Sequence, residues 1–336
     1  MRQLAWVGPG RLEWRDADEP AGPGPCGAVV RPVAVATCDF DHLIVAGLTP
    51  IETGSAIGHE CVAEVLAVGS EVDTVRPGDL VIVPYQVSCG DCTRCRAGLT
   101  GSCNRVPWLS CFGLGDFGGG FGGAMADRMV VPYADAMLVA APAGVAPEVL
   151  AAMSCNLCDA LNTVDAVRSF PGEPVLVAGG AFGSIALFAV QFALALGAGR
   201  VDYLDDDPQR CAQAAALGAH LLDPADVPAA SYPVTVDAAL DVDRLNVLLS
   251  ATAPGGVCTA STMYPSNAVA LPLFTMFQHC LTFRTGQPHV RSLLPTVLDL
   301  VAGGRVDPGL LITTVDWDDA PEAFARGRGK TVCLRS

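Results

Sequence analysis

The sequence has little positive charge and no long, uninterrupted apolar run. Its 336 residues include 20 Lys and Arg against 35 Asp and Glu, and the formal net charge is −15. Because a surface of this sign repels nucleic-acid phosphates, we expect no nucleic-acid partner. The most apolar stretch, residues 185–198, is interrupted by Gln191 and is shorter than a membrane span, so we expect no membrane segment.

The N-terminal residues also lack the apolar core of a secretion signal, so we expect a cytoplasmic protein. In a reducing compartment, the 14 cysteines are more typical of thiols or metal ligands than of disulfides. A chain of this length exceeds one ordinary hydrophobic core, and two domains are therefore expected.

The composition of the chain changes near residue 150. Before it, short Val-rich runs bounded by turn residues predict strands at 28–36, 61–68, 80–84 and 129–132. After a predicted helix at 147–167, strands and helices alternate, which is typical of a doubly wound parallel sheet in an α/β fold. The elements predicted there are strands at 175–178, 200–204, 234–238 and 256–260, helices ending at 196 and 217, a helix at 293–302 and a closing strand at 331–334.

Four cysteines lie close together, in the pattern Cys-x2-Cys-x2-Cys-x7-Cys. They are Cys89, Cys92, Cys95 and Cys103. Four thiolates at this spacing can enclose one tetrahedral zinc ion and leave no open coordination position, so the predicted site is structural. Spacing alone also permits an iron–sulfur cluster, although short loops of this kind favour zinc.

Three further residues carry side chains that bind zinc in catalytic sites. Cys38 follows a predicted strand, His59 precedes one, and Cys155 lies near the change in composition. Two cysteines, one histidine and an open position form a known catalytic zinc pattern. Each residue alone is also typical of a hydrophobic core, and their distances in the sequence do not join them.

Together these motifs resemble the zinc-dependent medium-chain dehydrogenases, the alcohol dehydrogenase family, over essentially the full chain. The resemblance implies a GroES-like, β-rich catalytic domain at 1–150 with a zinc lobe at about 86–106. A Rossmann cofactor domain would span 151–285, and residues 286–336 would return to the catalytic domain. The motifs that carry the resemblance are Cys38 near Asp41, Gly58-His59-Glu60, the four-cysteine lobe, Gly122-Gly123-Ala124, residues 175–179 and Pro254-Gly255-Gly256.

The same resemblance implies roles for individual residues. Cys38, His59 and Cys155 would bind a catalytic zinc ion, in addition to the structural zinc ion of the lobe. Glu60 would be a neighbouring carboxylate that can move onto the metal, and Asp41 would orient His59. Asp159 would lie where the family places a residue near the nicotinamide.

A glycine-rich turn between a strand and a helix predicts a dinucleotide site, although its match to G-x-G-x-x-G is imperfect. Asp205 ends the next strand, where a carboxylate can accept both hydroxyls of the adenosine ribose. By the resemblance, Arg210 flanks that ribose. Two more aspartates follow Asp205. Three adjacent carboxylates would repel the 2′-phosphate of NADP(H), so we expect NAD(H) as the cofactor. The turn residues whose backbone N–H groups can hold the pyrophosphate are Gly179, Gly180, Gly183 and Ser184.

The sequence departs from the family at the proton relay. Where the family has a serine or threonine that touches the substrate oxygen, this sequence has Phe40, and Leu43 replaces the relay histidine. The proton would then leave through His42, Glu60, Asp159 or water, or the reaction is not ordinary alcohol oxidation. Alternatively, Phe40 simply lines an apolar substrate pocket.

The sequence thus predicts a zinc-dependent oxidoreductase that transfers hydride between NAD(H) and an alcohol or carbonyl compound. Two alternatives stay open. One is a biosynthetic reductase of an imine or activated alkene on the same scaffold, and the other is a non-catalytic NAD-binding descendant. By the resemblance, we expect a homodimer or homotetramer whose cofactor domains pair through an edge strand at 281–285.

Overall fold

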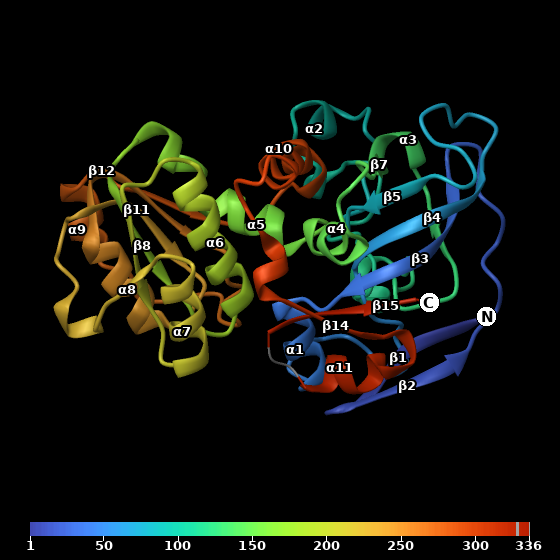
Figure 1. Cartoon of the computed structure of the whole chain (residues 1–336), viewed down its shortest axis with the longest axis horizontal. Helices are drawn as coiled ribbons and strands as arrows, with labels where there is room; N and C mark the ends of the chain where they lie inside the picture. Colours follow the sequence, from blue (N-terminus) through green and yellow to red (C-terminus); the bar gives the residue numbers. More distant parts are fainter. Residues whose placement is uncertain (327–328, 336) are drawn as a thin grey trace. The chain divides into compact units, whose positions relative to one another are not determined.

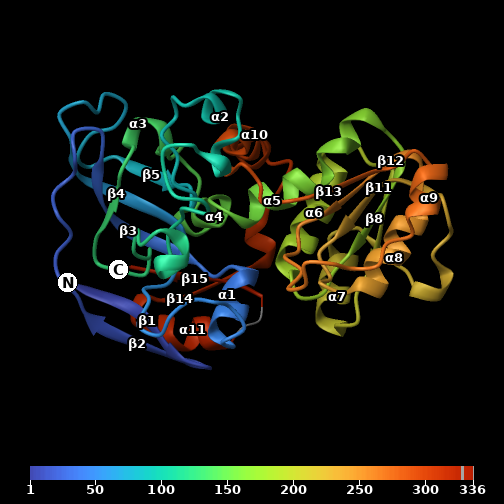
Figure 2. The same ribbon diagram turned by 180° about the vertical axis from the view of Figure 1, so that it is seen from behind.

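The computed structural model describes residues 1–326 and 329–335. Contacts between residues divide the chain into two units, which Figures 1 and 2 show from opposite sides. The domain limits at 150 and 285 that the sequence suggests stay predictions. The first unit contains Met1–Cys158, His289–Ala302 and Pro308–Ser336, and the second contains Asp159–Pro288 and Gly303–Asp307.

The first unit is built mainly on antiparallel strands. β1 (Arg2–Gly8) and β2 (Arg11–Asp16) pair with each other, and a larger sheet has the order β14-β15-β3-β4-β5-β7, with β6 paired to β3. The predicted strands of this region correspond to β3–β6, and none of their ends differs by more than one residue. The larger sheet consists of β3 (Ala28–Ala36), β4 (Glu60–Val68), β5 (Leu80–Val83), β6 (Met129–Val131), β7 (Val139–Ala140), β14 (Ile312–Asp316) and β15 (Lys330–Leu334).

The central strand pair of this sheet determines where the site residues lie. β3 and β4 are antiparallel, in a register that places Ala36 opposite Glu60. Valines such as Val30, Val35 and Val65 are fully buried in the core of the unit, which holds this register in place. Residues just after β3 and just before β4 therefore lie side by side.

Short helices cover the strands and fill the connections of the first unit. The predicted helix at 293–302 forms the larger part of α10. The helices are α1 (Asp39–Val45), α2 (Thr93–Arg96), α3 (Ala134–Met137), α4 (Pro147–Met153), α10 (Val290–Ala302) and α11 (Ala320–Arg326), with 3-10 turns at Thr100–Ser102, Gly115–Gly118, Pro308–Leu311 and Trp317–Asp319.

The single helix predicted at 147–167 is wrong. The structure has α4, then α5 (Asn156–Val164), then a 3-10 turn at Asp165–Ser169. Between α4 and α5, the Ser154 hydroxyl donates a 2.8 Å hydrogen bond to the carbonyl of Ala151, which competes with the helical backbone. The break leaves Cys155 buried between the two helices.

The second unit is a parallel sheet with helices in its connections. Its strand order is β10-β9-β8-β11-β12-β13, and β13 lies at one edge, as predicted. Helices α6 and α8 both contact the central strand β8. The strands are β8 (Pro174–Ala178), β9 (Arg200–Leu204), β10 (His220–Leu221), β11 (Tyr232–Asp237), β12 (Thr252–Ala260) and β13 (Thr282–Thr285), and the helices are α6 (Gly183–Ala195), α7 (Pro208–Ala216), a 3-10 turn at Pro224–Asp226, α8 (Val242–Ala251) and α9 (Leu273–Gln278).

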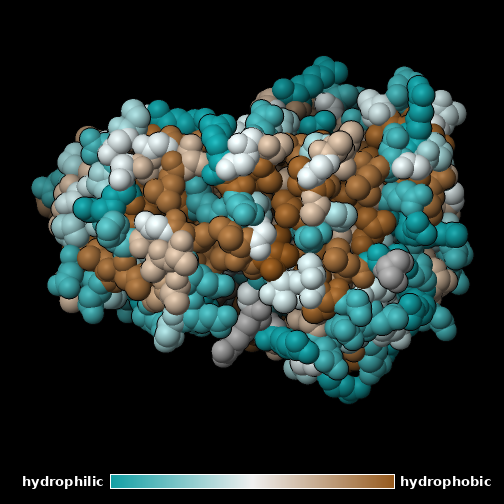
Figure 3. Space-filling model, in the orientation of Figure 1, coloured by the Kyte–Doolittle hydropathy of each residue, from teal (hydrophilic) through white to brown (hydrophobic). Residues whose placement is uncertain are grey.

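Apolar residues have two different surroundings in the second unit. Most of the apolar stretch at 185–198 forms α6, whose side chains are nearly all buried in the core. Among the described residues, no helix is both long enough and apolar enough to cross a bilayer. Apolar residues also reach the surface of this unit (Figure 3). Leu273, Phe274 and Phe277 of α9 are 68%, 73% and 81% exposed.

Candidate functional site

Four side chains of metal-binding type meet in the core of the first unit. Ligand atoms of Cys38, His59, Glu60 and Cys155 all lie within 4.8 Å of one another, and all four residues are buried. The Sγ atoms of Cys38 and Cys155 are 3.9 Å apart. Two sulfurs bound to one tetrahedral zinc ion at ~2.3 Å are about 3.8 Å apart, so this spacing suits zinc.

Three local features bring these residues together. Cys38 precedes α1, where its backbone N–H donates to Asp41 Oδ2 at 2.8 Å. His59 follows Gly58, whose φ of +86° favours glycine and turns the chain into β4. Cys155 lies in the break between α4 and α5. Because β3 and β4 are paired, the first two residues reach the same end of the sheet.

The surroundings of His59 favour its protonated form in the absence of a metal ion. Asp41 Oδ1 lies 3.4 Å from His59 Nδ1, and both side chains are almost fully buried. Burial lowers the pKa of His59, but the charges of Asp41 and Cys38 outweigh burial and raise it well above its usual value. Burial and the neighbouring Cys155 thiol raise the pKa of Cys38. A bound metal ion would reverse both preferences.

The only lysine of the chain binds Glu60. Lys330 Nζ donates to Glu60 Oε2 and to the Thr37 carbonyl, both at 2.6 Å, and both charged side chains are 0% exposed. Burial raises the pKa of Glu60 to about 7, although Lys330 lowers it. Glu60 Oε1 has no hydrogen-bond partner within residues 1–326 and 329–335. One carboxylate oxygen is thus held by Lys330, while the other stays beside the cysteines and His59.

A zinc ion therefore fits the donor set. Two sulfurs and one imidazole nitrogen are donors that zinc prefers, and a fourth position is left for Glu60 Oε1 or for another oxygen ligand. Sequence spacing did not join Cys38, His59 and Cys155, whereas the structure does. That they hold a metal ion stays a prediction.

The remaining cysteine group forms a separate lobe. Cys92 Sγ accepts backbone N–H bonds from Asn104 at 3.5 Å and Cys95 at 3.4 Å, which lower the pKa of its thiol to about 6. Such donors stabilise a thiolate, and a site with four sulfurs leaves no position for substrate. The lobe thus suits a structural zinc ion. The Sγ atoms that lie within 4.8 Å of one another belong to Cys89, Cys92, Cys95 and Cys103.

Of the relay candidates named from the sequence, Glu60 belongs to the metal cluster and His42 does not. Phe40 is partly buried and packs against the hydrophobic core of the first unit. His42 lies on α1, and its Nδ1 is buried without a hydrogen-bond partner among the described residues. Asp159 is buried on α5 and belongs to the second unit.

Tyr85, which the sequence analysis did not name, packs against the cluster. The centroids of the Tyr85 and His59 rings are 5.5 Å apart, with 60° between their planes. β4 and β5 are antiparallel, with Cys61 opposite Val83, so continuing this register brings Tyr85 opposite His59. A tyrosine after a short strand gives no signal of its own. Only the strand pairing identifies it.

The glycine-rich turn lies between β8 and α6 in the second unit, and α6 begins at Gly183. A Cβ at Gly179 would overlap the side chains of Tyr203 and Asp205, and a Cβ at Gly183 would overlap the side chain of Arg210. Glycines at these two positions therefore allow the turn to approach the end of β9 and the first turn of α7 closely.

Asp205 ends the strand region of β9, where the sequence predicts it, but its carboxylate already has protein partners. Arg210 donates to both Asp205 oxygens at 2.7 Å, and the Tyr203 hydroxyl donates to Oδ2 at 2.8 Å. Burial raises the pKa of Asp205, but the bonds from Arg210 outweigh burial and lower it. The neighbouring carboxylates have structural partners: Asp206 pairs with Arg244, and Asp207 caps α7.

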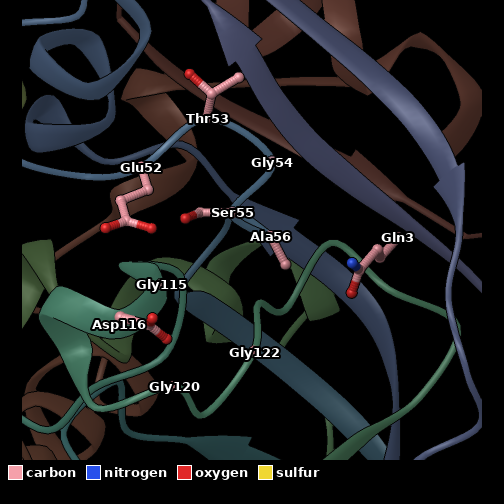
Figure 4. A pocket seen from close by; sticks show the side chains of 10 residues that line it. All are labelled: Gln3, Glu52, Thr53, Gly54, Ser55, Ala56, Gly115, Asp116, Gly120 and Gly122. Atoms are coloured by element: carbon pink, nitrogen blue, oxygen red, sulfur yellow. The ribbon is translucent and has the colours of Figure 1, made fainter.

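A shallow hollow of about 370 Å³ lies elsewhere on the first unit (Figure 4). Glu52, Ser55 and Asp116 line it together with several glycines. Figure 4 shows the Ser55 side chain pointing toward the space near the Glu52 carboxylate. None of the clustered cysteines, His59 or Glu60 lines this hollow.

Known proteins match this chain over both units. The alcohol dehydrogenase GroES-like domain matches residues 24–143, which include Cys38, His59 and the four-cysteine lobe. A probable zinc-binding alcohol dehydrogenase of Mycobacterium tuberculosis is 29% identical over 100% of this chain and 88% of that protein. The solved structure of alcohol dehydrogenase TADH from Thermus sp. ATN1 has a TM-score of 0.92 at 26% identity and covers 100% of both chains. The chain is thus similar over its whole length to zinc-type alcohol dehydrogenases, and residues 24–143 match their GroES-like domain.

Both parts of the predicted fold class are confirmed: a GroES-like, β-rich part and a Rossmann parallel sheet. A further relative is similar over a shorter span. The glutathione-independent formaldehyde dehydrogenase of Pseudomonas aeruginosa is 35% identical over 66% of this chain and 58% of that protein.

Proposed function

We propose that this protein transfers hydride between NAD(H) and an alcohol or carbonyl compound with the help of zinc. The observation that carries the proposal is the buried meeting of Cys38, His59 and Cys155 beside Glu60. If zinc served this protein only as a structural ion, the closed site of the four-cysteine lobe would be enough. The second set of donors, in the cluster, therefore needs another role. A donor set that leaves a position for substrate is the catalytic pattern.

The residues around the site have separate tasks. When bound, zinc would supply a Lewis acid for the substrate oxygen, and NAD(H) would supply or accept the hydride. Cys38, His59 and Cys155 would hold the metal, while Asp41 would keep the imidazole oriented. Lys330 balances the charge of Glu60 and fixes one of its oxygens, so the other oxygen stays at the cluster.

We propose NAD(H) rather than NADP(H) because of Asp205. Its low pKa keeps it ionised, so it would accept hydrogen bonds from a ribose and repel a 2′-phosphate. Arg210 binds both carboxylate oxygens, so its side chain would have to move aside to admit the ribose hydroxyls. Gly179, Gly180, Gly183 and Ser184 would offer the pyrophosphate their backbone N–H groups at the start of α6.

Phe40 favours a second candidate function, the reduction of an imine or an activated alkene. Phe40 cannot accept the hydroxyl proton that alcohol oxidation releases at the reacting oxygen, whereas a reduced imine or alkene takes up its proton at nitrogen or carbon, from solvent. The retained donor set of the cluster argues against a non-catalytic NAD-binding descendant.

We also propose a homo-oligomer, either a dimer or a tetramer. β13 is an edge strand, and α9 exposes Leu273, Phe274 and Phe277. Edge strands and exposed apolar helices are typical of surfaces that another chain covers. Light scattering should give a multiple of the 34.6 kDa chain mass, and Phe277→Glu should lower it. A monomeric wild type would contradict the proposal.

A substrate panel tests the proposed function. Alcohols, aldehydes, ketones, imines and enones are assayed by NADH and NADPH absorbance on protein with measured zinc content. We expect turnover of an alcohol–carbonyl pair with NAD(H) and two zinc ions per chain. Turnover of imines or enones alone would favour the second candidate. One zinc ion per chain, with no turnover of any compound, would refute both.

A further inference from the structure

Asp237 is a buried carboxylate at the carboxyl edge of the parallel sheet, and the cofactor residues named above do not include it. It is the last residue of β11 and is 0% exposed. Its register partners are Ala178, the last residue of β8, and Ala260, the last residue of β12. The glycine-rich turn therefore leaves the sheet on one side of Asp237, and the segment after β12 leaves it on the other side.

The strand order of the sheet reverses beside Asp237. From β8, the strands β9 and β10 follow in one direction, whereas β11, β12 and β13 follow in the other. In open parallel sheets, ligands bind at the carboxyl ends of the strands where the order reverses. The dinucleotide proposed for this protein is therefore expected beside the ends of β8 and β11, next to Asp237.

Asp237 ties the segment after β12 to the edge of the sheet. Its Oδ2 accepts hydrogen bonds from the hydroxyls of Tyr264 at 2.7 Å and Thr262 at 3.1 Å. Its backbone carbonyl accepts the Ser261 N–H at 3.0 Å. The Tyr264 ring packs against the hydrophobic core of this unit, while residues 265–268 are all exposed. Tyr264 thus anchors the segment directly before an exposed stretch.

The other carboxylate oxygen of Asp237 shapes the corner that holds the glycine-rich turn. Asp237 Oδ1 accepts the Ala239 N–H at 3.0 Å. The Ala239 carbonyl then accepts the Ala181 N–H at 3.2 Å, and a parallel bond of 3.0 Å joins the Ala238 carbonyl to the Phe182 N–H. One buried carboxylate therefore fixes both the glycine-rich turn and the segment after β12.

From this arrangement we infer that Asp237 is a positioning residue of the dinucleotide site and acts through the Tyr264 hydroxyl. It holds the segment 261–264 in place relative to the glycine-rich turn, so the cofactor does not have to order this segment when it binds. The inference rests on the proposed function, because it concerns the dinucleotide named there. It adds a residue that sets the affinity for the cofactor by holding the walls of its site.

Two tyrosine variants separate positioning from simple stability. Tyr232 is the matched control, because its hydroxyl also donates a 2.7 Å hydrogen bond to a buried aspartate, Asp202, but from the first residue of β11. The probe is NADH, titrated by its fluorescence. We expect Tyr264→Phe to weaken NADH binding about 3- to 10-fold, whereas Tyr232→Phe stays within about twofold of wild type. Tyr232→Phe should nevertheless lower Tm at least as much, since Tyr232 is only 1% exposed.

Asp237→Ala extends the test to the carboxylate itself, since it removes both acceptor oxygens. We expect it to weaken NADH binding at least as much as Tyr264→Phe. Adding Tyr264→Phe to Asp237→Ala should weaken binding by no more than about twofold further, because both changes interrupt the same contact. Losses that multiply independently would show that Asp237 does not act through Tyr264 and would overturn the inference.

The outcomes of these titrations distinguish the inference from the proposed function. A Tyr264→Phe protein with the NADH affinity of wild type, or an equal loss in Tyr232→Phe, would overturn the inference and leave the proposed function intact. A wild type that binds neither NADH nor NADPH would refute both. A loss confined to Tyr264→Phe and Asp237→Ala, in a protein whose wild type turns over no substrate, would refute the proposed function alone.

Discussion

Removing the only lysine should destabilise the first unit by about 3–5 kcal/mol. Lys330 and Glu60 are both 0% exposed, and Lys330→Met leaves the carboxylate buried without its cation. Breaking a buried ion pair by removing one partner costs about 3–5 kcal/mol. The Thr37 carbonyl loses a donor in the same variant. Glu60→Gln should restore part of the loss in the Lys330→Met background, because the uncompensated charge disappears.

The cost of Lys330→Met should grow with pH. With Lys330 present, burial raises the folded-state pKa of Glu60 from 4.5 to about 7. Without Lys330, this pKa rises further. Below pH 7, Glu60 is protonated in both folded proteins, so it adds no difference between them. Above pH 7, Glu60 loses its proton in the folded wild type but keeps it in the folded variant. The free energy of unfolding of the variant therefore falls relative to wild type until the pH reaches the folded-state pKa of Glu60 in the variant.

Thermal unfolding of the metal-free proteins at pH 6 and pH 9 measures this effect. For a domain of this size, 1 kcal/mol shifts Tm by about 2–4 °C, so the expected decrease at pH 9 is at least about 6 °C. The control is Arg326→Met, which removes an exposed pair with Glu322 and should shift Tm by no more than about 2 °C. A Lys330→Met decrease under 2 °C at pH 9, or an equal decrease at both pH values, would refute the reasoning.

Three further predictions concern the metal sites and the cofactor. Cys38→Ser should abolish turnover and lower the zinc content from two ions to one per chain. The affinity for NADH should stay within about twofold of wild type. A variant that is merely unfolded would contradict the assignment. Cys92→Ser should remove the other zinc ion and lower Tm, since the lobe is closed by four sulfurs; unchanged zinc content would speak against it. Asp205→Gly should weaken NADH binding at least about tenfold in a titration and NADPH binding less, whereas equal losses would discard the cofactor assignment.

Most strands of the two larger sheets could be predicted from composition, whereas the sequence analysis gave no strand for β1, β2, β7, β10 or β14. Val-rich runs between turn residues gave β3 with both of its ends, and the alternation after residue 150 indicated a parallel sheet with helical connections. The break between α4 and α5 could not be predicted in this way. The Ser154 hydroxyl bonds to the Ala151 carbonyl at this break, but Thr163 makes the same kind of bond to Ala160 within α5, so such a residue does not mark a helix end in the sequence.

The site was only partly predictable. The four-cysteine lobe is local, so its spacing sufficed to group its residues. Cys38, His59 and Cys155 are far apart in the sequence, and only the family resemblance joined them before the structure did. Tyr85 depended on the register of β4 against β5, and the Arg210–Asp205 contact depended on side-chain conformation. Neither the placement of Tyr85 nor the Arg210–Asp205 contact can be recognised from the composition or the spacing of the sequence.

The central claim is that Cys38, His59 and Cys155 share one zinc ion, and anomalous diffraction at the zinc absorption edge tests it most directly. We predict two anomalous peaks per chain, one among the four lobe sulfurs and one between the sulfurs of Cys38 and Cys155 and the imidazole of His59. A fully zinc-loaded crystal with a peak in the lobe alone would contradict the claim.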